Sequence, residues 1–115
     1  MNALKGAKWS QKLREFLESQ EYDIRFNYIN RETDAQIDHV KKEIIFNLPL
    51  FLASCLVHEF IHYKNGWDNP AGERKTRRLE TRVIRDYLTD GQINELGWKV
   101  LRYSTKGGKY AKKSK

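Results

Sequence analysis

Two histidines four residues apart, His58 and His62, enclose a glutamate at position 59. On an α-helix, residues four apart lie one above the other, so both imidazoles can bind one metal ion. Glu59 is displaced from that line, and its carboxylate is a candidate to take a proton from a water molecule that the metal activates. The pattern therefore predicts a metal site that supports hydrolysis, with Glu59 as general base.

The residues before the motif favour a metal over a pair of structural histidines. Residues 48–57 are nearly all apolar, which is typical of a helix buried on every side. Two imidazoles and a carboxylate on such a helix would carry a high desolvation cost without a partner, and a metal is the simplest partner. Asn47 is the expected N-cap, Pro49 fits the first turn, and Asn65-Gly66 should end the helix. Cys55 is expected to be an inert core residue.

The motif supplies two ligands, whereas a catalytic zinc normally has three protein ligands and a water. No histidine follows His62, so the third ligand should be a carboxylate. Glu80 is preferred because it lies in mid-helix among apolar residues and should face the core. Glu73 stands at the helix start, where the helix dipole already explains an acid, and Asp68 lies in the preceding loop. We therefore expect one Zn²⁺ per chain, bound by His58, His62 and Glu80, with Glu73 and Asp68 as alternatives.

The scaffold around these residues is expected to be a single α+β domain over residues 1–105. It should contain an N-terminal helix, a short and mostly antiparallel sheet, a buried active-site helix and a glutamate-bearing helix. Trp9, Leu13, Phe16 and Leu17 form an apolar stripe on the first helix and are expected to pack in the core. The expected elements are a helix over 10–19, strands over 22–29, 35–40 and 43–47, and helices over 48–64 and 73–89. Residues 92–104 fit either a helix or a strand.

Composition and charge limit the environment of the chain. Its 115 residues allow one modest core, and its single cysteine excludes an internal disulfide framework. The net charge of +7 is concentrated after Lys106, where a Lys-rich tail (residues 106–115) is expected to be a flexible, solvated end. Nucleic acid binding through this tail is conceivable but not favoured. No secretory signal or membrane span is recognisable, so a cytoplasmic location without a membrane partner is expected.

The pattern of His58, Glu59 and His62, a glycine-containing loop and then Glu80 on a second helix resembles the gluzincin zinc peptidases. The short chain and the order of its elements are similar to the minigluzincins, and the likeness covers roughly residues 22–90. A second resemblance is to the ImmA/IrrE-type metallopeptidases, whose glutamate helix is similar in outline to residues 80–88. Arg85 and Asp86 depart from that helix, because they stand where it has alanines.

The resemblance implies a zincin-like fold and zinc-dependent hydrolysis of a peptide or protein substrate. His58, His62 and Glu80 would be the ligands, and Glu59 would be general base and acid. A peptide would dock by strand pairing on an edge formed by residues 35–47.

Other functions remain open at this stage. The minigluzincin likeness raises the hypothesis of a latent enzyme whose cleft is covered by residues 92–105, and ordinary core packing of that segment is the alternative. A regulatory protease that acts on a repressor, as in the ImmA/IrrE likeness, is another possibility. The third is a binding module that zinc merely stabilises. Glu59 argues against this last function, because a structural metal site needs no base.

Overall fold

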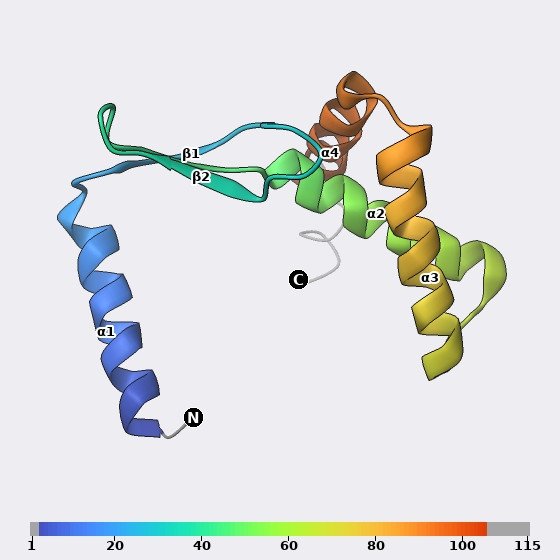
Figure 1. The fold of residues 1–115 in the computed structure, drawn as a ribbon, viewed down its shortest axis with the longest axis horizontal. Helices are drawn as coiled ribbons and strands as arrows, with labels where there is room; N and C mark the ends of the chain where they lie inside the picture. The colour runs from blue at the N-terminus through green and yellow to red at the C-terminus, as the bar shows by residue number, and fades with distance from the viewer. Residues whose placement is uncertain (1–2, 106–115) are drawn as a thin grey trace.

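The computed structural model describes residues 3–105 of the chain as an α+β structure, which confirms the expected class. The Lys-rich tail lies outside the described residues. None of the helices within residues 3–105 combines the length and the apolar character needed to cross a bilayer. In chain order the elements are α1 (Ala3–Ser19), β1 (Asp23–Phe26), β2 (Ala35–Asp38), β3 (Glu43–Phe46), α2 (Leu48–Asn65), α3 (Pro70–Arg82), the π-helix η1 (Val83–Tyr87) and α4 (Asp90–Thr105) (Figure 1).

The sheet is mixed rather than mostly antiparallel. Strands β2 and β3 form the expected antiparallel hairpin, in which Ala35 pairs with Phe46 and Asp38 with Glu43. Strand β1 pairs with β3 in parallel, so the order is β1-β3-β2 and β3 is central. The parallel pairing arises because the chain between β1 and β2 crosses the end of the sheet before the hairpin begins. Both β1 and β2 are therefore edge strands.

Asn47 fixes the start of α2 and joins it to the preceding loop. Its side-chain oxygen accepts a hydrogen bond from the Leu50 amide, which confirms the expected N-cap. Its side-chain amide donates to the carbonyls of Asn30 and Thr33, and the side chain is almost fully buried. Because each polar group of this side chain has a partner, its burial is compensated.

The core lies where α2, η1 and α4 meet. Leu50 and Ala53 of α2 pack with Ile84 of η1 and with Ile93 of α4, and Ala53 and Ile93 have no exposed surface. Residues 92–104 therefore form a helix in the core. The capping box at the start of α4 explains the helix, because Thr89 and Gln92 each accept a hydrogen bond from the other's backbone amide.

Two sequence expectations about burial were wrong. Helix α2 is not buried on every side: Phe51 and Phe60 are 62% and 56% exposed. The stripe on α1 does not pack in the core either, and Trp9 is 60% exposed. Figure 1 shows the reason, because α1 lies beyond the sheet, apart from the helices that form the core. The other exposed members of that stripe are Leu13, Phe16 and Leu17.

Arg31 joins the loop after β1 to the end of η1. Its guanidinium donates to the carbonyl oxygens of Arg85 (2.8 Å) and Leu88 (3.0 Å) and forms an ion pair with Asp90 (3.3 Å). These carbonyls are free because a helix leaves its last carbonyls without intrahelical donors. Tyr28 completes the cluster, since its hydroxyl donates to Asp90 at 2.5 Å.

Replacing Tyr28 with phenylalanine should lower the free energy of unfolding by about 1 kcal/mol at neutral pH, because the hydrogen bond to Asp90 is lost. Burial, followed by the hydrogen bond to Asp90, raises the pKa of Tyr28 to about 12. Because the pKa of Tyr28 is higher in the folded state, the protonated hydroxyl stabilises the fold. This contribution is complete below pH 10, the pKa in the unfolded chain, and is lost as the pH rises toward 12. Urea unfolding should therefore show that the free energies of unfolding of wild type and Tyr28→Phe differ less at pH 11 than at pH 8. An unchanged difference would contradict this role of the hydroxyl.

Candidate metal centre

His58 and His62 lie one turn apart on α2, and the Nε2 atoms of both face one carboxylate, that of Glu73. The distance from His62 Nε2 to Glu73 Oε1 is 2.9 Å, and that from His58 Nε2 to Glu73 Oε2 is 3.3 Å. One ligand atom from each of these three residues lies within 4.8 Å of the others. Two imidazole nitrogens and a carboxylate oxygen at this spacing can hold a divalent metal ion.

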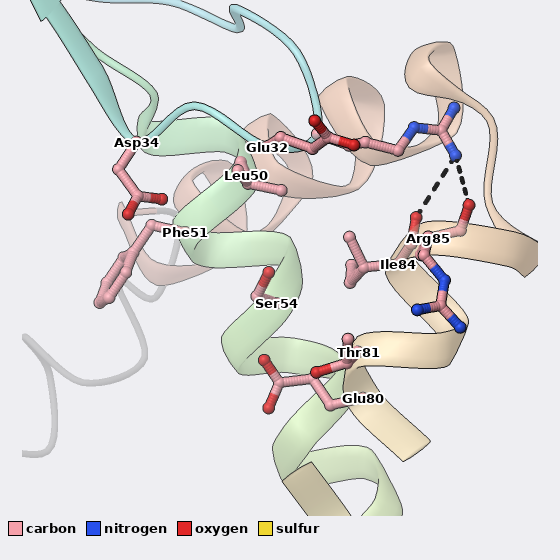
Figure 2. A pocket seen from close by; sticks show the side chains of 10 residues that line it. Glu32, Asp34, Leu50, Phe51, Ser54, Glu80, Thr81, Ile84 and Arg85 are labelled. Carbon is pink, nitrogen blue, oxygen red and sulfur yellow. Dashed lines mark hydrogen bonds between the residues drawn. The ribbon is translucent and has the colours of Figure 1, made fainter. Parts of the chain in front are cut away.

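Glu80 contacts His58 at the other ring nitrogen, Nδ1. Its carboxylate lies 2.8 Å from His58 Nδ1, and Figure 2 shows it reaching from α3 toward α2. The sequence favoured Glu80 as third ligand and kept Glu73 as an alternative. In the structure, the two acids are seven residues apart on one face of α3, so both point at α2. Glu73 reaches the Nε2 atoms, whereas Glu80 reaches only Nδ1 of His58.

The hydrogen bonds of the imidazoles fit a metal at the Nε2 atoms. When His58 carries its proton on Nδ1 and donates a hydrogen bond from it to Glu80, the lone pair of Nε2 is free to bind a metal. The Nδ1 atom of His62 is buried and has no hydrogen-bond partner among the described residues. Its nearest acid is Asp68, whose Oδ1 lies 3.8 Å away. Asp68 is therefore placed beside His62 on the side away from Glu73.

A tight connection between α2 and α3 brings Glu73 back to His62. Gly66 ends α2 with a positive φ of 63°, as the sequence predicts, and Asn69 caps α3 by accepting from the Gly72 amide at 2.7 Å. A Cβ atom at position 72 would lie 2.5 Å from the Cβ of Trp67. Only glycine fits there, so this close approach sets the angle at which α3 leaves α2.

Neighbouring groups shift the pKa values of Glu73 and His58. A hydrogen bond from Arg77 (3.1 Å), followed by that of His62, lowers the pKa of Glu73. The hydrogen bond to Glu80 is the largest cause of a raised pKa at His58, and the charges of Glu73, Glu80 and Glu59 add to it. Glu73 is therefore held as a carboxylate, which is the form that binds a metal.

Glu59 lines an open cleft of about 580 Å³ beside these histidines. Its side chain is exposed, so water and substrate can reach it. Cys55 also lines this cleft and is exposed, so the expectation of a core cysteine was wrong. Partial desolvation of its thiol, followed by the charges of Glu80 and Glu59, raises the pKa of Cys55. The other residues around the cleft are Phe51, His58, Glu73, Arg77, Glu80 and Thr81.

A second pocket of about 410 Å³ adjoins the cleft and shares Phe51, Glu80 and Thr81 with it. Figure 2 shows this pocket between α2, η1 and the loop before β2, with Phe51 turned away from Ile84. Apolar and charged side chains both line it. Apart from the shared residues, these are Arg31, Glu32, Asp34, Leu50, Ser54, Ile84 and Arg85.

Neither α4 nor the sheet contributes a residue to the lining of the cleft, which comes from α2 and α3 alone. Of the two alternatives for residues 92–105, the structure shows core packing, because α4 buries Ile93 and lies against α2. The strand edge of residues 35–47, on which the resemblance implies that a peptide docks, contributes no residue to this cleft. Figure 1 shows the sheet extending away from the start of α2.

Comparison of the chain with models of protein families, with curated proteins and with solved structures found no match. The geometry of His58, His62, Glu73 and Glu80 is therefore the basis for assigning a function.

Proposed function

We propose that this chain is a zinc-dependent hydrolase of zincin-like architecture that cleaves peptide bonds. The observation that carries the proposal is the convergence of one ligand atom each from His58, His62 and Glu73 within 4.8 Å of one another. Both Nε2 atoms lie against the Glu73 carboxylate. Nitrogen from imidazole and oxygen from carboxylate are ligands that zinc prefers, and three protein ligands leave a position open for water. In this assignment Glu73 is the third ligand, in place of the preferred Glu80.

Each neighbouring residue has a distinct role in this proposal. Zinc, when bound, supplies Lewis-acid chemistry: it polarises a carbonyl and lowers the pKa of water. Glu59 takes the proton from the attacking water in the open cleft and then gives it to the leaving amine. Glu80 holds the His58 ring by its Nδ1–H and so presents Nε2, a positioning role that acts through the histidine.

The open cleft supports a peptide rather than a small-molecule substrate. The cleft continues into the second pocket past Phe51 and Thr81, so an extended chain can lie across both. Arg77 at the cleft wall offers a cation to a carbonyl or carboxylate of that chain. A module stabilised by zinc without catalysis is less well supported, because the exposed side chain of Glu59 beside the cluster forms no hydrogen bond or ion pair with another residue in 3–105.

Elemental analysis should find about one zinc per chain in the wild type and none in His58→Ala. Glu80→Gln should lower the affinity for zinc by about 10- to 100-fold, which is usual for a carboxylate that orients a ligand. Glu73→Gln should lower the affinity further, because it removes a ligand. Competition with a zinc-binding dye would measure both affinities.

Two outcomes would count against this assignment. A larger loss in Glu80→Gln than in Glu73→Gln would return the third ligand to Glu80. No zinc uptake by the wild type on titration would remove the hydrolase proposal.

A further inference from the structure

The outward face of α3 carries a run of basic side chains that continues to Arg85 of η1, which pairs with Asp86. At 100° per residue, the basic side chains of α3 lie within an arc of about 160° around the helix axis, with Arg77 at one edge and Lys75 at the other. Neither acidic residue of α3 falls within this arc. The two acids of α3, Glu73 and Glu80, point to the opposite side, toward the histidines. We call this surface the arginine face, and its exposed members are Arg74, Lys75, Arg77, Arg78, Arg82 and Arg85.

The arginine face places like charges next to one another along the helix. Arg74, Arg78 and Arg82 follow one another at intervals of four residues, and each like-charge pair at this spacing destabilises a helix by about 0.2–0.5 kcal/mol. None of these three has an ion pair with another described residue, whereas Arg77 pairs with Glu73 and Arg85 with Asp86. Arg82 still lies close enough to Asp86 for its charge to help lower the pKa of that carboxyl. A ligand with negative charge would give partners to the rest of the row.

Two depressions that share Arg78 and Arg82 lie along the row. One, of about 350 Å³, is lined by Thr81 and four arginines. The other, of about 340 Å³, shares Arg78 and Arg82 with the first and adds Trp67, Lys75 and Leu79. The Nζ atom of Lys75 lies 5.7 Å from the centre of the Trp67 ring, so a cation and an aromatic ring stand together there.

We propose that the arginine face binds single-stranded nucleic acid. Arg74 and Arg82 are eight residues apart, so the row is about 12 Å long, enough to contact several successive phosphates. The guanidinium fork matches a phosphate in two-point hydrogen bonding. Trp67 offers an aromatic ring on which a base can stack, and Leu79 adds an apolar contact beside it. This face is distinct from the Lys-rich tail.

The proposal does not depend on hydrolysis or on zinc. Arg77 and Thr81 line both the cleft and the first depression, and Arg85 lines both the second pocket and the first depression. The depression that contains Trp67 contains none of these three residues. A peptide leaving the cleft could reach the first depression, but the second would remain without a function.

Fluorescence anisotropy with a labelled 20-nucleotide oligothymidine would test the assignment on the full chain. The double variant Arg78→Ala/Arg82→Ala should raise the Kd at least about tenfold at low salt. It should also reduce the slope of log K against log salt by about 1.4, since each phosphate contact with a single strand contributes about 0.7. Its melting temperature should be unchanged or higher, because alanine favours the helix and the repulsion is removed.

The matched control is Lys8→Ala/Lys99→Ala, which removes the same charge from exposed positions on α1 and α4. Its Kd should change less than about threefold if local contacts, rather than net charge, determine binding. Equal losses in the two double variants, or full binding by Arg78→Ala/Arg82→Ala, would overturn the proposal. If polyglutamate displaces the labelled oligothymidine as well as unlabelled oligothymidine does at the same concentration of negative charge, the face would instead be assigned to an acidic protein. Tighter binding of duplex DNA would overturn the single-strand assignment.

Discussion

Replacing Glu59 with glutamine should lower peptide hydrolysis by about 10²- to 10⁴-fold, the usual contribution of a general base. Glutamine keeps the size and the hydrogen-bonding shape of the side chain but cannot accept the proton of water at neutral pH. Glu59 is exposed and lies outside the group of His58, His62 and Glu73, so zinc content and melting temperature should stay at their wild-type values. Loss of activity with retained zinc is the result that distinguishes a catalytic base from a structural residue.

A mixture of unstructured peptides of diverse sequence, analysed by mass spectrometry after incubation with zinc-loaded protein, would measure this loss whatever the cleavage preference of the enzyme. Glu95→Gln on α4 is the matched control, because it makes the same chemical change at a position outside the cleft. Cleavage by Glu59→Gln at the rate of the control would contradict the role of Glu59. Loss of zinc in Glu59→Gln alone would show that this side chain supports the metal itself.

Replacing Gly97 with alanine should be the most destabilising of the glycine-to-alanine changes in the described structure. A Cβ atom at this position would lie 2.6 Å from the carbonyl carbon of Pro49, inside the range that real Cβ atoms avoid. Pro49 is fully buried in the first turn of α2, so the backbone itself must move. Overpacking of this kind costs about 1–3 kcal/mol, and displacement of a helix against its neighbour puts the expected loss near the upper end.

Gly91→Ala is the matched control in the same helix. A Cβ there would meet nothing closer than the Thr89 hydroxyl at 4.0 Å, and alanine favours a helix by about 1 kcal/mol over glycine. Thermal or urea unfolding should therefore show a large loss for Gly97→Ala and no loss for Gly91→Ala. Equal stability of the two variants would mean that α4 does not approach Pro49 as closely as in the structure.

The helix of the motif could be predicted from the sequence because its determinants are local. The pair of histidines, the cap at Asn47 and the stop at Gly66 each depend on residues within one or two turns, and the structure confirms the two ends of α2. The hairpin of β2 and β3 was predictable for the same reason, since its turn and its alternating residues are adjacent in the chain. The parallel partner β1 was not, because its pairing joins residues that lie on either side of the whole β2 segment.

Burial was harder to predict than the elements themselves. The apolar stripe of α1 and the apolar run of α2 look the same in sequence whether or not another element covers them. In the structure α4 covers one side of α2, and the exposed aromatics Phe51 and Phe60 show that another side has no cover among the described residues. The capping box of Thr89 and Gln92 was a local signal for α4 that could have resolved the choice between helix and strand.

The sequence by itself determined that two imidazoles share one face of a helix and that Glu59 lies beside them, because an i, i+4 spacing fixes this within a single turn. Only the tertiary structure decided which carboxylate meets which nitrogen. Glu73 and Glu80 lie on the same face of α3, so their spacing alone does not distinguish them. The choice depends on how α3 leaves α2, which the contact between Gly72 and Trp67 sets across the loop. That angle brings Glu73 to both Nε2 atoms and leaves Glu80 to hold His58 from behind.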